Sequence, residues 1–391
     1  MNNKTNVLSD VLLMVITCIA VAATYLFAVK VENIPGFSWA TLISMPIAVV
    51  LNTVFHEAAH MIVGAANGFR TISVRFLWFR FYKEGGRTKF ALTGAFDQIG
   101  EAEIIPVKKE NIEKRYKKVA LSGIIANAIL ACVYPGLAFL WGKTWFEGSL
   151  LFALTAFGFP ISVYYVLSNA LPMSLDLVRN DGAILKGIKD NDDVTKVMFS
   201  LMNVHAELYL GKSPAEIDKK YYFDVPQLPE DEPFFTVLLN NRYYYYLDAG
   251  DTVNAIKTAE RIESLTGYMS KSYLKETRTD ELYNCCVLTK DFKKADDITE
   301  DYEKYLNKVS SVKNLRAKAA YAAYVLKDKT LAEHIYYGAE EALSSYPVEG
   351  LKKLEEKLLN GIKEEIDSLP EPEETEKEAD ENFTGTTEAD K

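Results

Sequence analysis

Residues 37–66 read FSWATLISMPIAVVLNTVFHEAAHMIVGAA, and this stretch decides the fold of the chain. It is apolar over most of its length, and about 20 such residues in a helix cross the roughly 30 Å hydrocarbon core of a bilayer. Three further runs are long and apolar enough to do the same, namely residues 7–29, 119–141 and 149–171. The first run contains a cleavage-like triplet at residues 20–22, but it stays apolar to Val29, which favours a retained span over a signal peptide. The sequence therefore predicts a mainly helical protein with a polytopic membrane core of about four transmembrane helices.

Charge divides the 391 residues into two unlike halves. Residues 1–190 hold 18 Lys and Arg against 13 Asp and Glu, whereas residues 191–391 hold 26 against 41. The acidic half has no stripe of positive charge that could neutralise phosphates, so nucleic acid is not an expected partner.

The 4 cysteines show no CxxC spacing and no framework of pairs. This pattern excludes a disulfide scaffold or a cysteine zinc site as the organising feature.

The loop between the second and third predicted spans, residues 68–118, is basic and patterned. It holds 12 Lys and Arg, so the positive-inside rule predicts that this loop, both termini and the acidic half of a multi-pass protein are cytoplasmic. The expected location is a bacterial cell membrane. Apolar and polar residues alternate from Ile72 to Trp78, and a Gly-Gly turn at residues 84–87 precedes a second apolar stretch up to Phe96. The loop is therefore predicted to form a β-hairpin with an apolar face against the membrane surface.

The rest of the chain, from residue 191, shows helical periodicity. Three similar stretches lead to Ala255, Ala295 and Ala332, which are spaced 40 and 37 residues apart. They resemble degenerate tetratricopeptide repeats, although any antiparallel helical hairpin gives a similar spacing. The final segment, residues 367–391, has 10 acidic residues against 2 basic ones and is expected to be disordered. The predicted organisation is a membrane domain (1–190), an all-helical cytoplasmic repeat domain (191–366) and an acidic tail (367–391).

A cluster of polar residues inside the second span carries the chemistry. His56 and His60 are two of the 4 histidines of the chain, and their spacing places both imidazoles on one helix face, one turn apart, as ligation of a single Zn²⁺ requires. Glu57 between them is placed to act as a general base on the attacking water and then as an acid toward the leaving amine. The alternative is packing against other spans, but these groups are costly in a membrane unless they have a function. His205 and His334 have no ligand spacing and are expected to be surface or partly packed residues.

Three motifs together resemble the site-2 protease family of intramembrane zinc metalloproteases, over roughly residues 37–190. They are the HExxH motif at residues 56–60, Gly123-Ile124-Ile125-Ala126-Asn127 in the next span, and Asn169-Ala170-Leu171-Pro172 followed by Asp181-Gly182. Catalytic zinc usually takes three protein ligands, and the resemblance implies that Asp181 is the third. By its distance from Asn169, Asp176 fits the commonest spacing of the family better, and Asp181 could instead be the N-cap of a helix that begins at Gly182.

The resemblance also implies a role for two asparagines and for the loop. Asn169 is expected to help hold the substrate backbone near the zinc. Asn127 is expected either to contact substrate near the site or to form a hydrogen bond between helices. An intramembrane substrate must unwind before hydrolysis, so a strand edge of the hairpin is expected to capture it by backbone pairing, with simple membrane association as the alternative.

The leading hypothesis is an intramembrane zinc endopeptidase that hydrolyses peptide bonds of a membrane-spanning protein or a membrane-inserted peptide. As the family does, it would release regulators or process signal peptides. The helical repeats would bind a cytoplasmic protein partner or restrict access to the site. The second hypothesis is a catalytically silent membrane scaffold that acts through these repeats. The intact Glu57 argues against the scaffold, because a scaffold has no need of that carboxylate in lipid.

Overall fold

A computed structural model describes residues 39–76, 78–84, 87–92, 100–141, 150–175, 178–269 and 271–371, together with isolated positions between residues 11 and 26. The first predicted span, residues 7–29, lies largely outside the described residues, and so does the acidic tail beyond residue 371. The described chain is mainly helical and contains a small antiparallel sheet.

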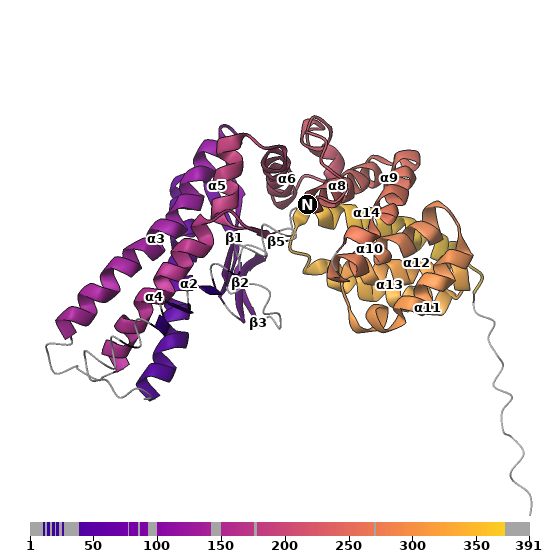
Figure 1. Cartoon of the computed structure of the whole chain (residues 1–391). Coiled ribbons are helices and arrows are strands. Elements are labelled where there is room, and N and C mark those ends of the chain that lie inside the picture. Colours follow the sequence, from indigo (N-terminus) through magenta and orange to yellow (C-terminus); the bar gives the residue numbers. More distant parts are fainter. Residues whose placement is uncertain are drawn as a thin grey trace, which may run out of the picture. The chain divides into compact units, whose positions relative to one another are not determined.

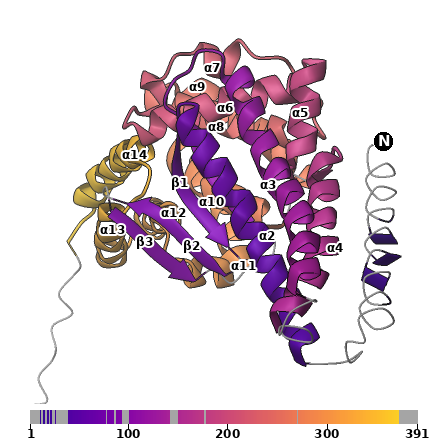
Figure 2. The same cartoon turned by 90° about the vertical axis from the view of Figure 1, so that its left-hand side faces the viewer.

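Three long apolar helices lie side by side: α2 (Trp39–Ala66), α3 (Ile112–Trp141) and α4 (Leu150–Ala170) (Figures 1 and 2). Among the residues that the structure describes, these are the three helices long and apolar enough to cross a membrane. They coincide with the second, third and fourth predicted spans. Each contains one proline in its interior, which membrane helices tolerate because neighbouring helices satisfy the freed backbone groups.

Hydrogen bonds join α2 to α4 within this apolar layer. Ser162 Oγ donates to Asn52 Oδ1 over 2.7 Å, and the hydroxyls of Thr53 and Tyr165 are also 2.7 Å apart. Such bonds hold membrane helices together where apolar packing alone gives little preference for one neighbour over another. Asn52 and Thr53 lie one turn before His56 and Glu57 on α2.

The basic loop forms a four-stranded antiparallel sheet, so the prediction of a two-stranded hairpin is wrong in strand number. Its strands are β1 (Phe69–Phe76), β2 (Phe79–Glu84), β3 (Arg87–Leu92) and β4 (Gly100–Pro106), in the order β3-β2-β1-β4. The residues predicted as one strand up to Trp78 belong to β1 and to the connection into β2. β4 escaped prediction because its sequence, GEAEIIP, contains two glutamates and so lacks a clear apolar alternation. The sheet lies beside α2 (Figure 2).

The chain divides into two compact units by its packing. The first comprises Met1–Thr277 and Leu343–Glu355, and the second comprises Arg278–Ala342 and Glu356–Lys391. In the first unit, α5 (Asp181–Asp190) and α6 (Asp193–Tyr209) share an apolar core with the sheet and with α3, since Ile184 and Phe199 pack with Phe69, Ile104 and Val119. Residues beyond 190 thus contribute to the core that supports the membrane half. The predicted boundary at residue 190 follows composition, whereas this division follows packing.

The remaining elements are short strands and helices. They are β5 (Ser174–Leu175), β6 (Val178–Arg179), η1 (Pro214–Glu216), α7 (Lys220–Phe223), α8 (Pro233–Ala249), α9 (Thr252–Ser264), η2 (Thr266–Tyr268), α10 (Lys271–Tyr283), η3 (Asn284–Leu288), α11 (Phe292–Lys308), α12 (Val312–Tyr321), η4 (Ala322–Leu326), α13 (Lys329–Ser344) and α14 (Glu349–Ser368). The last helix ends two residues into the segment predicted to be the disordered tail.

Three turns between these helices share one conformation. Each has a residue with positive φ, then an aspartate whose carboxylate accepts from a backbone N–H in the next helix, then a fully buried alanine four residues later. The positive-φ residues are Gly250, Lys290 and Lys327, the aspartates are Asp251, Asp291 and Asp328, and the alanines are Ala255, Ala295 and Ala332. These are the alanines that mark the predicted repeats. The repeat interpretation itself stays a prediction.

Candidate metal centre

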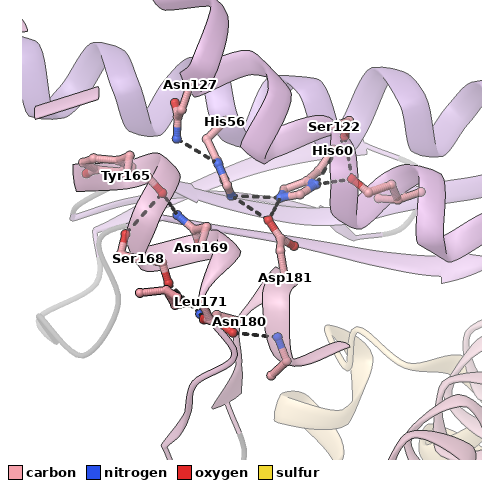
Figure 3. A network of polar contacts seen from close by, with 12 residues as sticks. His56, His60, Ser122, Asn127, Tyr165, Ser168, Asn169, Leu171, Asn180 and Asp181 are labelled. Carbon is pink, nitrogen blue, oxygen red and sulfur yellow. Dashed lines mark hydrogen bonds and ion pairs between the residues drawn. The ribbon is translucent and has the colours of Figure 1, made fainter. Parts of the chain in front are cut away.

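Three side chains, two from the apolar helix α2 and one from α5, converge (Figure 3). His56 and His60 extend from one face of α2, as their spacing predicts, and Asp181 approaches from the first turn of α5. The two Nε2 atoms are 3.0 Å apart, and each lies 3.3 Å from Asp181 Oδ2. Within the described part of the chain, this is the group of histidine, cysteine and acidic residues whose ligand atoms could hold one metal ion. We refer to it as the metal centre.

The donor set and its spacing fit Zn²⁺. Tetrahedral zinc with bonds of about 2.0–2.1 Å places its protein ligand atoms about 3.3 Å apart. The three atoms here are 3.0–3.3 Å apart, so one ion could reach all three without large movement. Asp181 Oδ2 is buried, and the two histidine Nε2 atoms face it, each at 3.3 Å. Two imidazole nitrogens and a carboxylate oxygen are ligand types that zinc takes in proteins, and a zinc ion among them would balance the charge of the buried carboxylate.

One stripe of α3 holds the two imidazoles. Val119, Gly123 and Asn127 follow each other at intervals of four residues, so they share a helix face. The Val119 carbonyl lies 2.9 Å from His60 Nδ1, and the Asn127 side-chain amide lies 3.1 Å from His56 Nδ1. A Cβ atom on Gly123 would lie only 2.5–2.7 Å from ring atoms of both histidines. Glycine at this position therefore makes room for the metal centre, a role that goes beyond the close helix packing that a membrane glycine usually serves.

Asp181 is held in place by its neighbour in sequence. Asn180 is the N-cap of α5, because its Oδ1 accepts from Ala183 N over 2.9 Å. The same oxygen accepts from Met173 N, and Nδ2 donates to the Ser168 and Leu171 carbonyls over 2.6 and 2.7 Å. The alternative that Asp181 is the N-cap is therefore wrong. The cap lies one residue earlier, which leaves the Asp181 carboxylate free to turn toward the histidines.

Sequence reasoning missed Asn180, although an Asn directly before Asp-Gly at a helix start is a recognisable N-cap signal. Gly182 also allows α5 to contact the end of α4 closely, because a Cβ atom there would lie no more than 2.8 Å from three backbone atoms of Asn169 and Ala170. The start of α5 thus packs directly on the end of α4. The competing ligand candidate, Asp176, follows β5 and lies outside the described residues.

Glu57 lies beside the metal centre and against the sheet. It is 7% exposed and follows His56 on α2. Gly100, the first residue of β4, approaches so closely that a Cβ atom on it would lie 2.9 Å from Glu57 Oε1. A larger residue than glycine would not fit at position 100. The beginning of β4 therefore lies directly against the Glu57 carboxylate, which is predicted to transfer protons.

The other predicted site residues have different surroundings. Asn169 is half-buried near the metal centre, and its Nδ2 donates to the Tyr165 carbonyl of its own helix over 3.0 Å (Figure 3). Its contact with substrate stays a prediction. His205 Nδ1 lies 3.8 Å from Glu103, and its ring packs against Tyr209. His334 lines a groove of the second unit, so neither of these histidines joins the metal centre.

Comparison of the chain with models of protein families, with curated proteins and with solved structures finds no match. The functional interpretation therefore rests on the motif residues and on the geometry that brings them together.

Proposed function

We propose that the protein is an intramembrane zinc endopeptidase of the site-2 protease type. The observation that carries the proposal is the convergence of His56 Nε2, His60 Nε2 and Asp181 Oδ2 within 3.3 Å of one another, beside Glu57 on an apolar helix. A site with three protein ligands is typical of catalytic rather than structural zinc, because the fourth position stays available for water or substrate. His56, His60 and Asp181 would hold the ion, which when bound polarises the scissile carbonyl and acidifies water.

The reaction is hydrolysis of a peptide bond, and Glu57 would move the protons. In this mechanism, the oxygen of the attacking water forms a bond to the carbonyl carbon, and Glu57 accepts the proton that the water loses. The C–N bond then breaks, and Glu57 returns the proton to the leaving nitrogen. A positioned general base of this kind contributes about 10²- to 10⁴-fold to a rate. Glu57 is buried on α2 against Gly100 of β4, which limits its contact with bulk water.

The sheet supports both uses predicted for the basic loop. Phe79 pairs with Leu92 and Phe81 with Phe90 across β2 and β3, which puts four large apolar side chains on one face. All four are exposed, as expected of a surface that rests in the membrane interface. Capture of an unwound substrate as an added strand is supported by β4, which begins at Gly100 against Glu57. We include both functions in the proposal.

In the proposed topology, the protein is multi-pass, with the 68–118 loop, the termini and the later helices in the cytoplasm. The 12 basic residues of that loop are the support for this orientation. The helices after residue 190 are proposed to form tetratricopeptide-like repeats that recruit a cytoplasmic partner or control access. The three turns that share one conformation, around Gly250, Lys290 and Lys327, support this part of the proposal.

Glu57→Gln tests the proposed function, because it removes the general base and leaves all three metal ligands in place. Membrane and secreted peptides are compared between cells that express the wild type and cells that express the variant. A species that accumulates uncut only with the variant identifies the substrate. Purified wild type and variant are expected to bind Zn²⁺ equally. Stoichiometric zinc without any Glu57-dependent cleavage would refute the protease and favour the membrane scaffold.

A further inference from the structure

Asn127 is fully buried in α3. Among the described residues, the nitrogen of its side-chain amide has a hydrogen-bond partner and the oxygen has none. Its Nδ2 lies 3.1 Å from His56 Nδ1. Its Oδ1 is buried and has no hydrogen bond from any residue that the structure describes. Buried amide oxygens nearly always have a partner, so an isolated one inside a membrane layer needs an explanation.

A second asparagine in the same layer shows the usual arrangement. Asn52 is equally buried, and both ends of its amide are used, since Nδ2 donates to the Ala48 carbonyl over 2.9 Å and Oδ1 accepts from Ser162 Oγ over 2.7 Å. The membrane layer can therefore satisfy a whole amide. The isolated oxygen of Asn127 is a property of its position beside His56.

The chemistry of metal ligation explains the difference. A neutral imidazole that binds a metal through Nε2 carries its hydrogen on Nδ1, which must then donate to an acceptor. The Val119 carbonyl, 2.9 Å from His60 Nδ1, can only accept, so it selects this tautomer for His60. The partner of His56 is an amide, which presents either a donor or an acceptor depending on how it is turned.

The two orientations of the Asn127 amide favour different states of His56. With Nδ2 toward the ring, Nδ1 must accept, and the ring hydrogen lies on Nε2, which faces His60 Nε2 at 3.0 Å and Asp181 Oδ2 at 3.3 Å. Half a turn of the amide brings Oδ1 to Nδ1. The oxygen then receives the ring hydrogen, Nδ2 takes the position that the oxygen has left, and the Nε2 lone pair of His56 becomes available to a cation.

We propose that Asn127 is a positioning residue for the metal centre, whose side-chain carbonyl accepts a hydrogen bond from His56 Nδ1–H when zinc is bound and so fixes the ligating tautomer. This inference rests on the proposed function, because it requires zinc at His56, His60 and Asp181. It gives Asn127 a role that acts through His56, by a hydrogen bond between α3 and α2, which is the second of the two alternatives that the sequence left open.

The test measures Zn²⁺ affinity of the purified full-length protein by competition with a chelator. Asn127→Leu has a similar size but no acceptor, and we expect it to bind zinc about 10- to 100-fold more weakly, as loss of a hydrogen-bond partner of a metal ligand does. Asn127→Asp keeps an acceptor and is expected to bind at least as tightly as the wild type. The matched control is Asn52→Leu, which removes the other buried amide and is expected to leave zinc affinity unchanged.

Wild-type affinity in Asn127→Leu would overturn the inference, and so would an Asn127→Asp variant as weak as Asn127→Leu. If Asn127→Leu does not fold, Asn127→Ala gives the same comparison with the same expected loss. A wild-type protein that binds no Zn²⁺ would refute the proposed function as well. Zinc binding that is normal in the wild type and equally normal in Asn127→Leu would refute this inference alone.

Discussion

Substitution of Gly123 by alanine is the sharpest perturbation of the metal centre. The methyl group enters the face of α3 that supports the imidazoles, where its carbon would lie 2.5 Å from His56 Cε1, 2.6 Å from His60 Nε2 and 2.7 Å from His56 Nδ1. Ordinary contacts of a Cβ atom begin at 3.4 Å. The two rings and α3 must therefore separate by 0.7–0.9 Å, the difference between these distances.

This displacement is large for a metal site and small for the fold. Ligand distances in metal sites hold to within about 0.2 Å, so a shift about four times larger removes at least one imidazole from the ion. We expect Zn²⁺ affinity to fall by about 100-fold or more, which exceeds the usual effect of losing only a hydrogen-bond partner of a ligand. Helix α3 itself should form at least as well, since alanine is favoured over glycine in a helix interior by about 1 kcal/mol.

The assay combines chelator competition for zinc with cleavage of a co-expressed membrane peptide. Gly136→Ala is the matched control, because it lies on the same helix and an added Cβ atom meets nothing within 4 Å. It should retain wild-type zinc affinity and cleavage. If Gly123→Ala also retains both, the imidazoles do not depend on the space beside Gly123, and the geometry of the metal centre described above is wrong.

Two further predictions concern the contact between α4 and α5 that positions Asp181, and a third concerns the metal ion. Asn180→Ala removes three hydrogen bonds to the end of α4 and the residues just after it, and the N-cap bond of α5, so we expect zinc affinity to fall about 10-fold or more. An unchanged affinity would show that Asp181 is held by other contacts. Gly182→Ala should push α5 from α4 and weaken zinc binding similarly in chelator competition, whereas the control Gly338→Ala, with nothing within 4 Å, should not. Removal of metal by a chelator should abolish peptide cleavage and added Zn²⁺ should restore it; cleavage that persists in the metal-free protein would exclude the zinc mechanism.

Much of the membrane half could be predicted because its signals are local. The lengths of the apolar runs predicted α2, α3 and α4 to within a few residues at most of their ends, although α3 begins seven residues earlier, at Ile112, than predicted. The sheet was predicted less well. β2 and β3 lie before and after Gly85 and Gly86 in the sequence, as expected, whereas β4 pairs with β1 across 23 intervening residues and carries glutamates that hide its strand character. Strand pairing at such a distance has no signature in a single sequence window.

The HExxH spacing alone determined that His56 and His60 share one face of a helix, because the 3.6-residue period is a property of the backbone. Only the tertiary structure decided what faces them. It brings Asp181 to both rings, places Gly123 and Asn127 behind them, and sets Gly100 against Glu57. These residues are far apart in the chain and meet because α2, α3, α5 and β4 pack together. Local periodicity fixes which side chains point the same way, and long-range packing fixes which of them meet.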